Sequence, residues 1–184
     1  MLSQFTSQEG KQTLKNYFDV PTDVYAVGRL DYDSEGLLIL SNDKKLNHAL
    51  LNPAHQHDRE YWVQVEGNIT AAAIEQLQSG VEIAVDGKIY FTKKCRATIF
   101  ETAPIVPARN PPIRVRKTIP DSWLKIKLTE GKNRQVRKMT AAVGFPTLRL
   151  IRNAIENCQL NGLQPGEIQK YSQAEMFALL ALNK

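Results

Sequence analysis

The feature that most constrains the fold is a regular alternation of side chains over eight residues, REYWVQVE, at positions 59–66. Two sets alternate there: Tyr61, Val63 and Val65 against Glu60, Trp62 and Gln64. A period of two places successive side chains on opposite faces of a strand. The pattern therefore predicts a half-buried strand, which requires neighbouring strands and a layer that covers its apolar face.

Capping residues and β-prone runs predict the other elements. Thr6 and Glu9 have the spacing of a capping box, which predicts a helix over residues 7–17, and Ser172 with Glu175 predicts a C-terminal helix in the same way. Three more helices are expected at residues 44–51 behind Asp43, from Thr70 to about residue 79, and at 133–143. Strands are expected at 24–27, 37–40, within 81–100 around a turn at Asp86-Gly87, at 123–128 and at 147–155.

This mixture of elements predicts an α+β fold around a largely antiparallel sheet flanked by helices. A length of 184 residues suits one domain, 1–184, or two lobes of about 1–60 and 61–184. No apolar run approaches the roughly 18 residues of a membrane span, and the first residues show no signal-peptide pattern. Cys95 and Cys158 lie far apart and outside any CxxC pattern, which predicts free thiols in a reducing cytoplasm.

Positive charge is concentrated in one part of the chain. Residues 93–152 contain 15 Lys and Arg against 3 acidic residues, whereas the rest contains 9 basic and 16 acidic residues. This asymmetry favours a nucleic-acid partner, and a solvated basic surface would produce the same pattern.

A proline-rich stretch lies within this basic region. Five of the nine prolines occur between Pro104 and Pro120, together with Arg109, Arg114, Arg116 and Lys117. Because proline removes backbone donors and disfavours helix, we expect an extended loop here, and a long basic loop is more often a contact surface than a simple connection.

Two motifs point to a family. Residues 28–43, GRLDYDSEGLLILSND, place Asp31 between Arg29 and an acidic turn that leads into an apolar run, and residues 130–139 read EGKNRQVRKM. The first string resembles the motif around the catalytic aspartate of pseudouridine synthases that modify ribosomal RNA. The second resembles the other signature of that branch. The resemblance extends over about residues 2–168 and implies the pseudouridine synthase fold.

The resemblance implies a role for five residues. Asp31 matches the catalytic aspartate, and Arg137 matches the arginine that forms an ion pair with it. Tyr61 matches the tyrosine that stacks on the target base. Leu150 falls where an apolar residue lines the pocket, and Arg29 falls where relatives contact RNA near the flipped nucleotide. Without the resemblance, Asp31 would be interpreted as a turn residue, and Tyr61 and Leu150 as core residues.

The implied chemistry suits these residue types. Isomerisation of a uridine breaks the bond from C1′ to N1, turns the base and joins C5 to C1′. A carboxylate can begin this as a nucleophile or as a base, and no metal or organic cofactor is required. A neighbouring arginine keeps such a carboxylate ionised in a partly dry pocket, because its guanidinium stays charged and can bind both carboxylate oxygens.

Further residues are expected to contact RNA phosphates. Gly131 allows Lys132 and the first amides of the helix at 133–143 to approach a phosphate. On that helix Val136, Thr140 and Val143 form the inward stripe, and Arg134, Arg137 and Lys138 lie on the other side. Arg114 and Arg116 of the proline-rich loop complete the expected contacts. His48, His55 and His57 match no metal-ligand spacing, so no metal site is expected.

Three stretches are most similar to a small subtype that modifies 23S rRNA and lacks an S4-type RNA-binding domain: REYWVQVEG, ARNPPIRVRKTIPDSWLKI and EGKNRQVRKMTAAVGFPTLRLIR. The similarity implies 23S rRNA as partner and uridine 2457 as target. We also expect a cytoplasmic monomer without membrane or metal contacts, and we expect the strand that relatives carry before LSQFT to be missing. Two alternatives remain: a non-catalytic RNA-binding ribosome-assembly factor, and a pseudouridine synthase for transfer RNA.

Overall fold

The computed structural model describes residues 1–113, 116 and 118–182. Its contacts divide the chain into two units, one of residues 1–57 with 153–184 and one of residues 58–152. The C-terminal residues thus belong with the N-terminal ones, whereas the lobes expected from the sequence placed all of 61–184 together.

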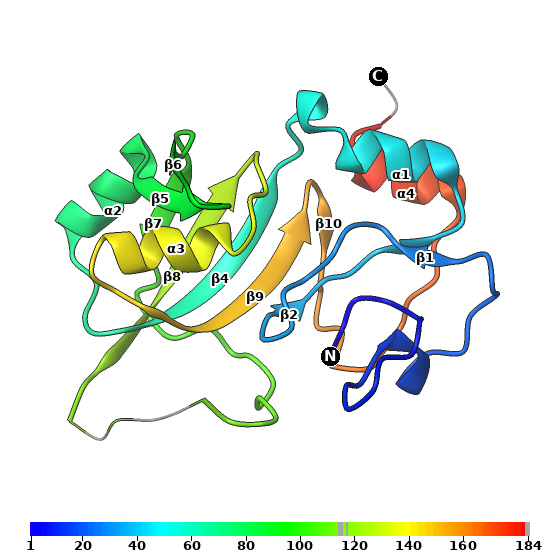
Figure 1. Ribbon diagram of the computed structural model, residues 1–184, viewed down its shortest axis with the longest axis horizontal. Coiled ribbons are helices and arrows are strands. Elements are labelled where there is room, and N and C mark those ends of the chain that lie inside the picture. Colours follow the sequence, from blue (N-terminus) through cyan, green and yellow to red (C-terminus); the bar gives the residue numbers. More distant parts are fainter. Residues whose placement is uncertain (114–115, 117, 183–184) are drawn as a thin grey trace. The chain divides into compact units, whose positions relative to one another are not determined.

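The unit 58–152 contains a sheet whose central strand is the alternating segment (Figure 1). Four strands follow one another in the order β7 (Arg96–Ile99), β8 (Asp121–Leu128), β4 (Arg59–Glu66) and β9 (Thr147–Ile155). β8 pairs antiparallel with both β4 and β7, and Tyr61 lies opposite Ile126. The predicted bounds of β4 and β9 are confirmed. A separate hairpin joins β5 (Glu82–Val85) to β6 (Lys88–Phe91) through the expected turn at Asp86-Gly87.

Two helices cover one face of this sheet, α2 (Ala71–Ser79) and α3 (Gln135–Ala142) (Figure 1). The Thr70 hydroxyl accepts a hydrogen bond from the Ala73 amide at 3.2 Å, which confirms the predicted cap of α2. Both helices contribute to a core cluster with the inward side chains of the strands, which include Val63, Val65, Leu124, Ile126, Leu128 and Leu150. The alternation in β4 is therefore explained, because one face of the strand packs under the helices.

The described residues of the other unit form short strands and two α-helices. β1 (Tyr25–Ala26) pairs antiparallel with β3 (Leu40–Ser41), β10 (Cys158–Gln159) pairs with the end of β9, and β2 is Glu35–Gly36. The helices are α1 (Lys44–Leu51) and α4 (Gln173–Leu179), with the short 3₁₀ helices η1 (Leu14–Asn16) and η2 (Pro53–His55). Its core cluster combines the two stretches of chain: Val27, Leu37, Ile39, Leu46, Leu50, Ile155, Cys158 and Leu180.

Caps and a buried histidine connect the two stretches. Asp43 accepts hydrogen bonds from the Lys45 and Leu46 amides at 2.8 and 3.2 Å, and Gln173 donates to the same carboxylate at 2.6 Å. The Gln173 bond, followed by the helix amides, lowers the pKa of Asp43. His57 contacts Glu156 through Nδ1 at 3.0 Å and the Ala49 carbonyl through Nε2 at 3.1 Å. These contacts explain why residues 153–184 group with the N-terminal part.

The predicted helix at residues 7–17 is wrong. Only η1 is helical there, and the preceding residues form isolated bridges from Leu2 to Thr13 and from Gln8 to Lys11. The Leu2 amide donates to the Gln12 carbonyl at 2.8 Å, and Gly10 adopts a φ of 69°. Backbone groups that a helix would have paired locally are thus bound to a neighbouring segment, and glycine supplies the turn.

The strand predicted at residues 37–40 is also shifted. Only Leu40 belongs to β3, although Leu37 and Ile39 are buried and the Ile39 carbonyl accepts from the Val27 amide at 2.8 Å. The apolar run contributes core side chains, but burial alone does not create a ladder of strand hydrogen bonds. None of the helices in the described part of the chain is long and apolar enough to cross a membrane.

Candidate active site

Asp31 lies in a tight turn of the unit formed by residues 1–57 and 153–184. The Ser34 amide donates to the Asp31 carbonyl at 2.9 Å, and the Ser34 hydroxyl lies 3.5 Å from Asp31 Oδ2. Just before the turn, the Leu30 amide donates to Ser3 Oγ at 3.0 Å. The Asp31 side chain is half-buried, and Arg29 is exposed. Hydrogen bonds on both sides of Asp31 therefore fix the backbone that carries its carboxylate.

Gly28 opens the segment that leads to Asp31. Its φ of +78° is a conformation that side chains rarely adopt, and a Cβ there would lie 3.3 Å from Leu51 Cδ2 of α1. A glycine is therefore required by both the backbone angle and the nearby helix. The buried Val27 before it anchors the segment in the core of this unit.

Tyr61 and Leu150 lie on neighbouring strands of the unit 58–152. Leu150 belongs to the buried core cluster, and the half-buried Tyr61 packs against that cluster. Arg152, two residues after Leu150 on β9, is 5% exposed; desolvation lowers its pKa, and the interaction with Tyr61 acts in the opposite direction. Sequence reasoning missed Arg152. A signal was present in TLRLIR, because positions 150 and 152 share one face of a strand.

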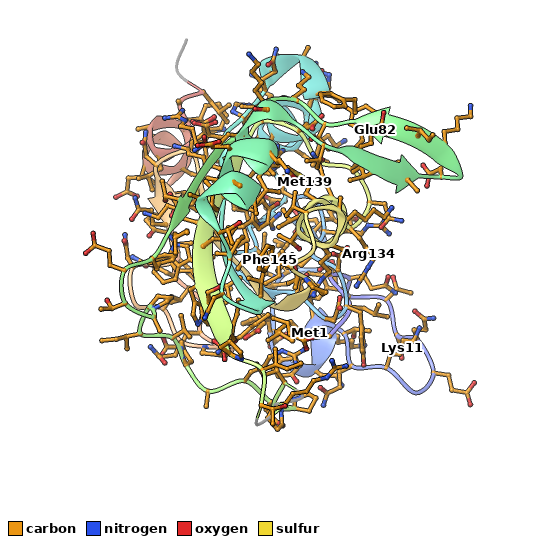
Figure 2. The ribbon with its side chains drawn as sticks, turned by 90° about the vertical axis from the view of Figure 1, so that its left-hand side faces the viewer. Met1, Lys11, Glu82, Arg134, Met139 and Phe145 are labelled. Atoms are coloured by element: carbon orange, nitrogen blue, oxygen red, sulfur yellow. The ribbon has the colours of Figure 1, made fainter. Side chains whose placement is uncertain are left out.

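Helix α3 carries Arg137 on the side away from its apolar stripe. Val136 and Thr140 are buried as predicted, Val143 packs half-buried against the core, and Met139 is fully buried. Arg137 and Lys138 are half-exposed, whereas Arg134 is exposed at the start of the helix. Figure 2 shows Met139 and Arg134 on different sides of α3. The helix begins two residues later than predicted, because Arg134 adopts a φ of 55° as its N-cap.

A hydrogen-bonded network holds the start of α3. The buried Gln135 side chain accepts from the Lys132 amide at 2.9 Å and donates to Glu130 at 2.5 Å. Glu130 also accepts from the Tyr90 hydroxyl at 2.5 Å and from the Lys93 amide at 2.9 Å. The Glu130 bond raises the pKa of Tyr90. Glu130 and Gln135 of the second motif thus serve to position the helix, a role that the sequence pattern did not reveal.

The basic side chains expected to bind RNA have varied environments. Lys132 Nζ lies 4.9 Å from the centre of the Tyr90 ring, and Arg116 forms an ion pair with Glu66 at 3.1 Å. Arg114 lies outside the described residues. The described residues between β7 and β8 form no helix or strand, in agreement with the expected loop, and Arg149 donates to the Pro107 carbonyl at 2.7 Å.

The structure brings together some of the site residues that the sequence predicts. Tyr61 and Leu150 meet at the core cluster on which α3, the helix of Arg137, also packs. Asp31 and Arg29 belong to the other unit. Within the described residues, no group of three or more His, Cys, Asp and Glu side chains could hold a metal ion.

A comparison with protein families identifies the fold and the activity class. Residues 2–142 match the model of the family described as RNA pseudouridylate synthase. The chain belongs to this family. It is therefore an isomerase, and the resemblance inferred from the two motifs is confirmed.

Individual relatives agree with this assignment. The chain is 51% identical over 167 residues to the ribosomal large subunit pseudouridine synthase E of Xanthomonas axonopodis pv. citri. The aligned region covers 90% of this chain and 85% of the relative. The protein of the same name from Vibrio vulnificus is 48% identical, over 93% of this chain and 70% of the relative. A solved pseudouridylate synthase superposes with a TM-score of 0.73 at 25% identity, over 91% of this chain and 65% of that one. The predicted fold class is confirmed.

Proposed function

We propose that this isomerase converts one uridine of 23S rRNA, of the uridine-2457 type, to pseudouridine. The observation that carries the proposal is the 51% identity, over 90% of the chain, to a relative named for the large ribosomal subunit. The family match supports the reaction, and the 15 basic against 3 acidic residues of 93–152 support an RNA substrate.

Asp31 begins the reaction, as a nucleophile at the sugar or the base or as a base that removes a sugar proton. The bond from C1′ to N1 breaks, the uracil turns, and C5 bonds to C1′. The proton on C5 then leaves to solvent and the freed N1 takes up a proton, so the product is an isomer of the substrate. Every step is a bond exchange within one nucleotide or between that nucleotide and Asp31, and the reaction therefore uses no cofactor or metal.

Three other residues complete the proposed site. Arg137 forms an ion pair with Asp31 and keeps the carboxylate ionised. Tyr61 stacks on the uracil, and Leu150 forms the floor under it. The uridine flips out of its helix to reach them, which costs a few kcal/mol of unstacking. The shared core cluster of Tyr61, Leu150 and the helix of Arg137 supports these roles.

The remaining contacts are to phosphates and flanking nucleotides. Arg29 contacts RNA beside the flipped uridine. Lys132, Arg134, Arg114 and Arg116 bind phosphates, so affinity falls steeply with salt as counterions are released. Recognition is mainly of RNA shape and of unstacked bases. The protein acts as a monomer in the cytoplasm, where ribosomal RNA is modified.

Release of tritium from C5-labelled uridine in unmodified 23S rRNA fragments tests the proposal. Formation of the bond from C5 to C1′ expels the label, so the wild-type protein releases it and Asp31→Asn does not. Asp33→Asn, a substitution in the same turn, is the matched control and retains most turnover. RNA affinity, measured by filter binding, changes little in Asp31→Asn.

Three outcomes would contradict the proposal or a part of it. A folded wild-type protein that binds the RNA without releasing tritium would be a non-catalytic assembly factor. Release from transfer RNA but not from 23S rRNA would keep the reaction and replace the substrate. An equal loss of affinity and turnover in Asp31→Asn would make Asp31 a structural residue.

A further inference from the structure

Glu130 joins the end of the β5–β6 hairpin to the start of α3. Its carboxylate accepts hydrogen bonds from the Tyr90 hydroxyl at 2.5 Å, the Lys93 amide at 2.9 Å and the Gln135 side-chain amide at 2.5 Å. Tyr90 belongs to β6, Lys93 follows that strand, and Gln135 is the first residue of α3. The Gln135 side chain in turn accepts from the Lys132 amide at 2.9 Å. One carboxylate thus connects two segments that are distant in the sequence.

Two exposed lysines belong to the segments that this carboxylate connects. Lys93 is held through its own amide, and its side chain is exposed. The side chain of Lys132 is also exposed, and its Nζ lies 4.9 Å from the centre of the Tyr90 ring, whose hydroxyl is bound to Glu130. A Cβ at Gly131 would meet nothing within 4 Å. The loop between the two motif residues Glu130 and Lys132 is therefore open to a ligand.

The protein itself does not neutralise these two ammonium groups. Within the part of the chain that the structure describes, neither Lys93 nor Lys132 forms an ion pair with a carboxylate. The Lys127 ammonium, in contrast, lies 3.0 Å from Asp58. Exposed cations without a carboxylate partner release counterions when they bind a phosphate, and this release is the main source of affinity for an RNA backbone.

We propose that Glu130 is a positioning residue that fixes Lys93 and Lys132 relative to each other, so that both bind phosphates of one stretch of RNA. The inference rests on the proposed function, which supplies the RNA, and it adds Lys93 to the residues that bind it. A glutamate suits this role because an ionised carboxylate only accepts hydrogen bonds, so its two oxygens can take all three donors. Two cations on a fixed frame also lose less conformational entropy on binding.

Glu130→Gln separates positioning from simple electrostatics, because the two predict effects of opposite sign. The amide keeps the shape of the side chain, removes one negative charge near the RNA and replaces an acceptor by a donor. Electrostatics alone predicts tighter binding. Loss of positioning weakens binding about three- to tenfold and makes the plot of log affinity against log salt concentration shallower by about 1. Filter binding of a 23S rRNA fragment at several salt concentrations measures both, and unchanged or tighter binding by a folded variant would overturn the inference.

Lys93→Gln tests the added phosphate contact. Affinity falls about three- to tenfold, the salt plot becomes shallower by about 1, and KM for tritium release rises while kcat stays within about twofold. Lys127→Gln is the matched control, because it removes the same charge from the same basic region. Its ammonium is already paired with Asp58, so affinity changes by less than about twofold. Equal effects of the two variants would assign affinity to net charge and overturn the inference.

A combined variant tests whether Glu130 acts through the two lysines. In a protein that carries Lys93→Gln and Lys132→Gln, the further change Glu130→Gln does not weaken binding. Additional weakening there would overturn the inference. If Glu130→Gln does not fold, Tyr90→Phe decides, since it removes only the hydroxyl bound to Glu130 and leaves the net charge unchanged. Tyr90→Phe weakens binding about two- to threefold, and unchanged binding would overturn the inference.

The same measurements distinguish this inference from the proposed function. A folded wild-type protein that does not bind the 23S rRNA fragment overturns the proposed function, and the inference with it. A wild-type protein that binds the fragment and releases tritium, beside a Glu130→Gln variant that binds equally well, overturns the inference alone. Weaker binding and a shallower salt plot in Glu130→Gln and in Lys93→Gln, with Lys127→Gln close to the wild type, is the result expected.

Discussion

In the unit 58–152, Tyr61 and Leu150 lie within strands of eight and nine residues, whereas in the other unit Asp31 lies in a turn between strands of two residues. The long strands hold their side chains through ladders of hydrogen bonds and a core under two helices. The turn is held by a few individual contacts, such as Ser3 with Leu30 and Asp31 with Ser34. The proposed catalytic carboxylate is thus carried by a turn with little regular secondary structure around it. Its placement depends on single hydrogen bonds and on backbone conformation.

The largest expected effect is in the sheet. Leu124 is fully buried between neighbouring strands and helices, so Leu124→Ala leaves a cavity and lowers the free energy of unfolding by about 3 kcal/mol. Ile89→Ala, at a position 80% exposed, changes it by less than about 0.5 kcal/mol. Urea unfolding followed by circular dichroism measures both. Similar losses for the two variants would show that the sheet core does not dominate stability.

A smaller effect is expected from the backbone before Asp31. Gly28→Ala forces a side chain into a φ of +78° and against Leu51, which lowers stability by about 1–3 kcal/mol and reduces turnover because the Asp31 turn shifts. Gly131→Ala is the control, since a Cβ there meets nothing within 4 Å and stability stays unchanged or rises slightly. Urea unfolding and tritium release are the measurements. A neutral Gly28→Ala would show that the turn tolerates rearrangement.

The pH dependence of stability should differ between the wild-type protein, in which the Cys95 thiol is half-buried, and the Cys95→Ala variant, which lacks that thiol. Desolvation raises the pKa of Cys95 to about 11, with a smaller contribution from Glu130. A pKa that is raised in the folded state contributes stability at low pH, and this is lost as pH rises from about 9 to about 11. The loss is about 1–2 kcal/mol after allowance for partial exposure of the thiol. Urea unfolding at several pH values shows a flatter profile for Cys95→Ala, and an equal slope in both proteins would assign the loss to other groups.

The smallest expected effect is at a single hydrogen bond beside Asp31. Ser3→Ala removes the acceptor of the Leu30 amide and lowers stability by about 1 kcal/mol. Because Leu30 adjoins Asp31, tritium release slows several-fold, more than the stability loss alone would produce. Ser7→Ala, at an exposed position of the same segment, leaves both unchanged. Equal turnover in the two variants would mean that the Ser3 contact does not position Asp31.

Most of the regular elements could be predicted from the sequence because their determinants are local. The period of two at residues 59–66 fixed β4, and side-chain caps at Asp43, Thr70 and Ser172 fixed the starts of α1, α2 and α4. The helix predicted at 7–17 failed because Thr6 and Glu9 have a capping spacing, whereas the backbone pairs instead with the segment at Leu2. Pairing between distant residues leaves no periodic signal.

The sequence by itself determined the family, through two motifs whose residue order is specific, and the residues proposed for chemistry. Only the tertiary structure decided that residues 153–184 belong with the N-terminal part, that Glu130 and Gln135 hold the start of α3, and that Arg152 is buried. The physical reason is the range of the interactions. Strand alternation and helix caps act within a few residues, whereas the environment of a buried charge depends on which strands become neighbours.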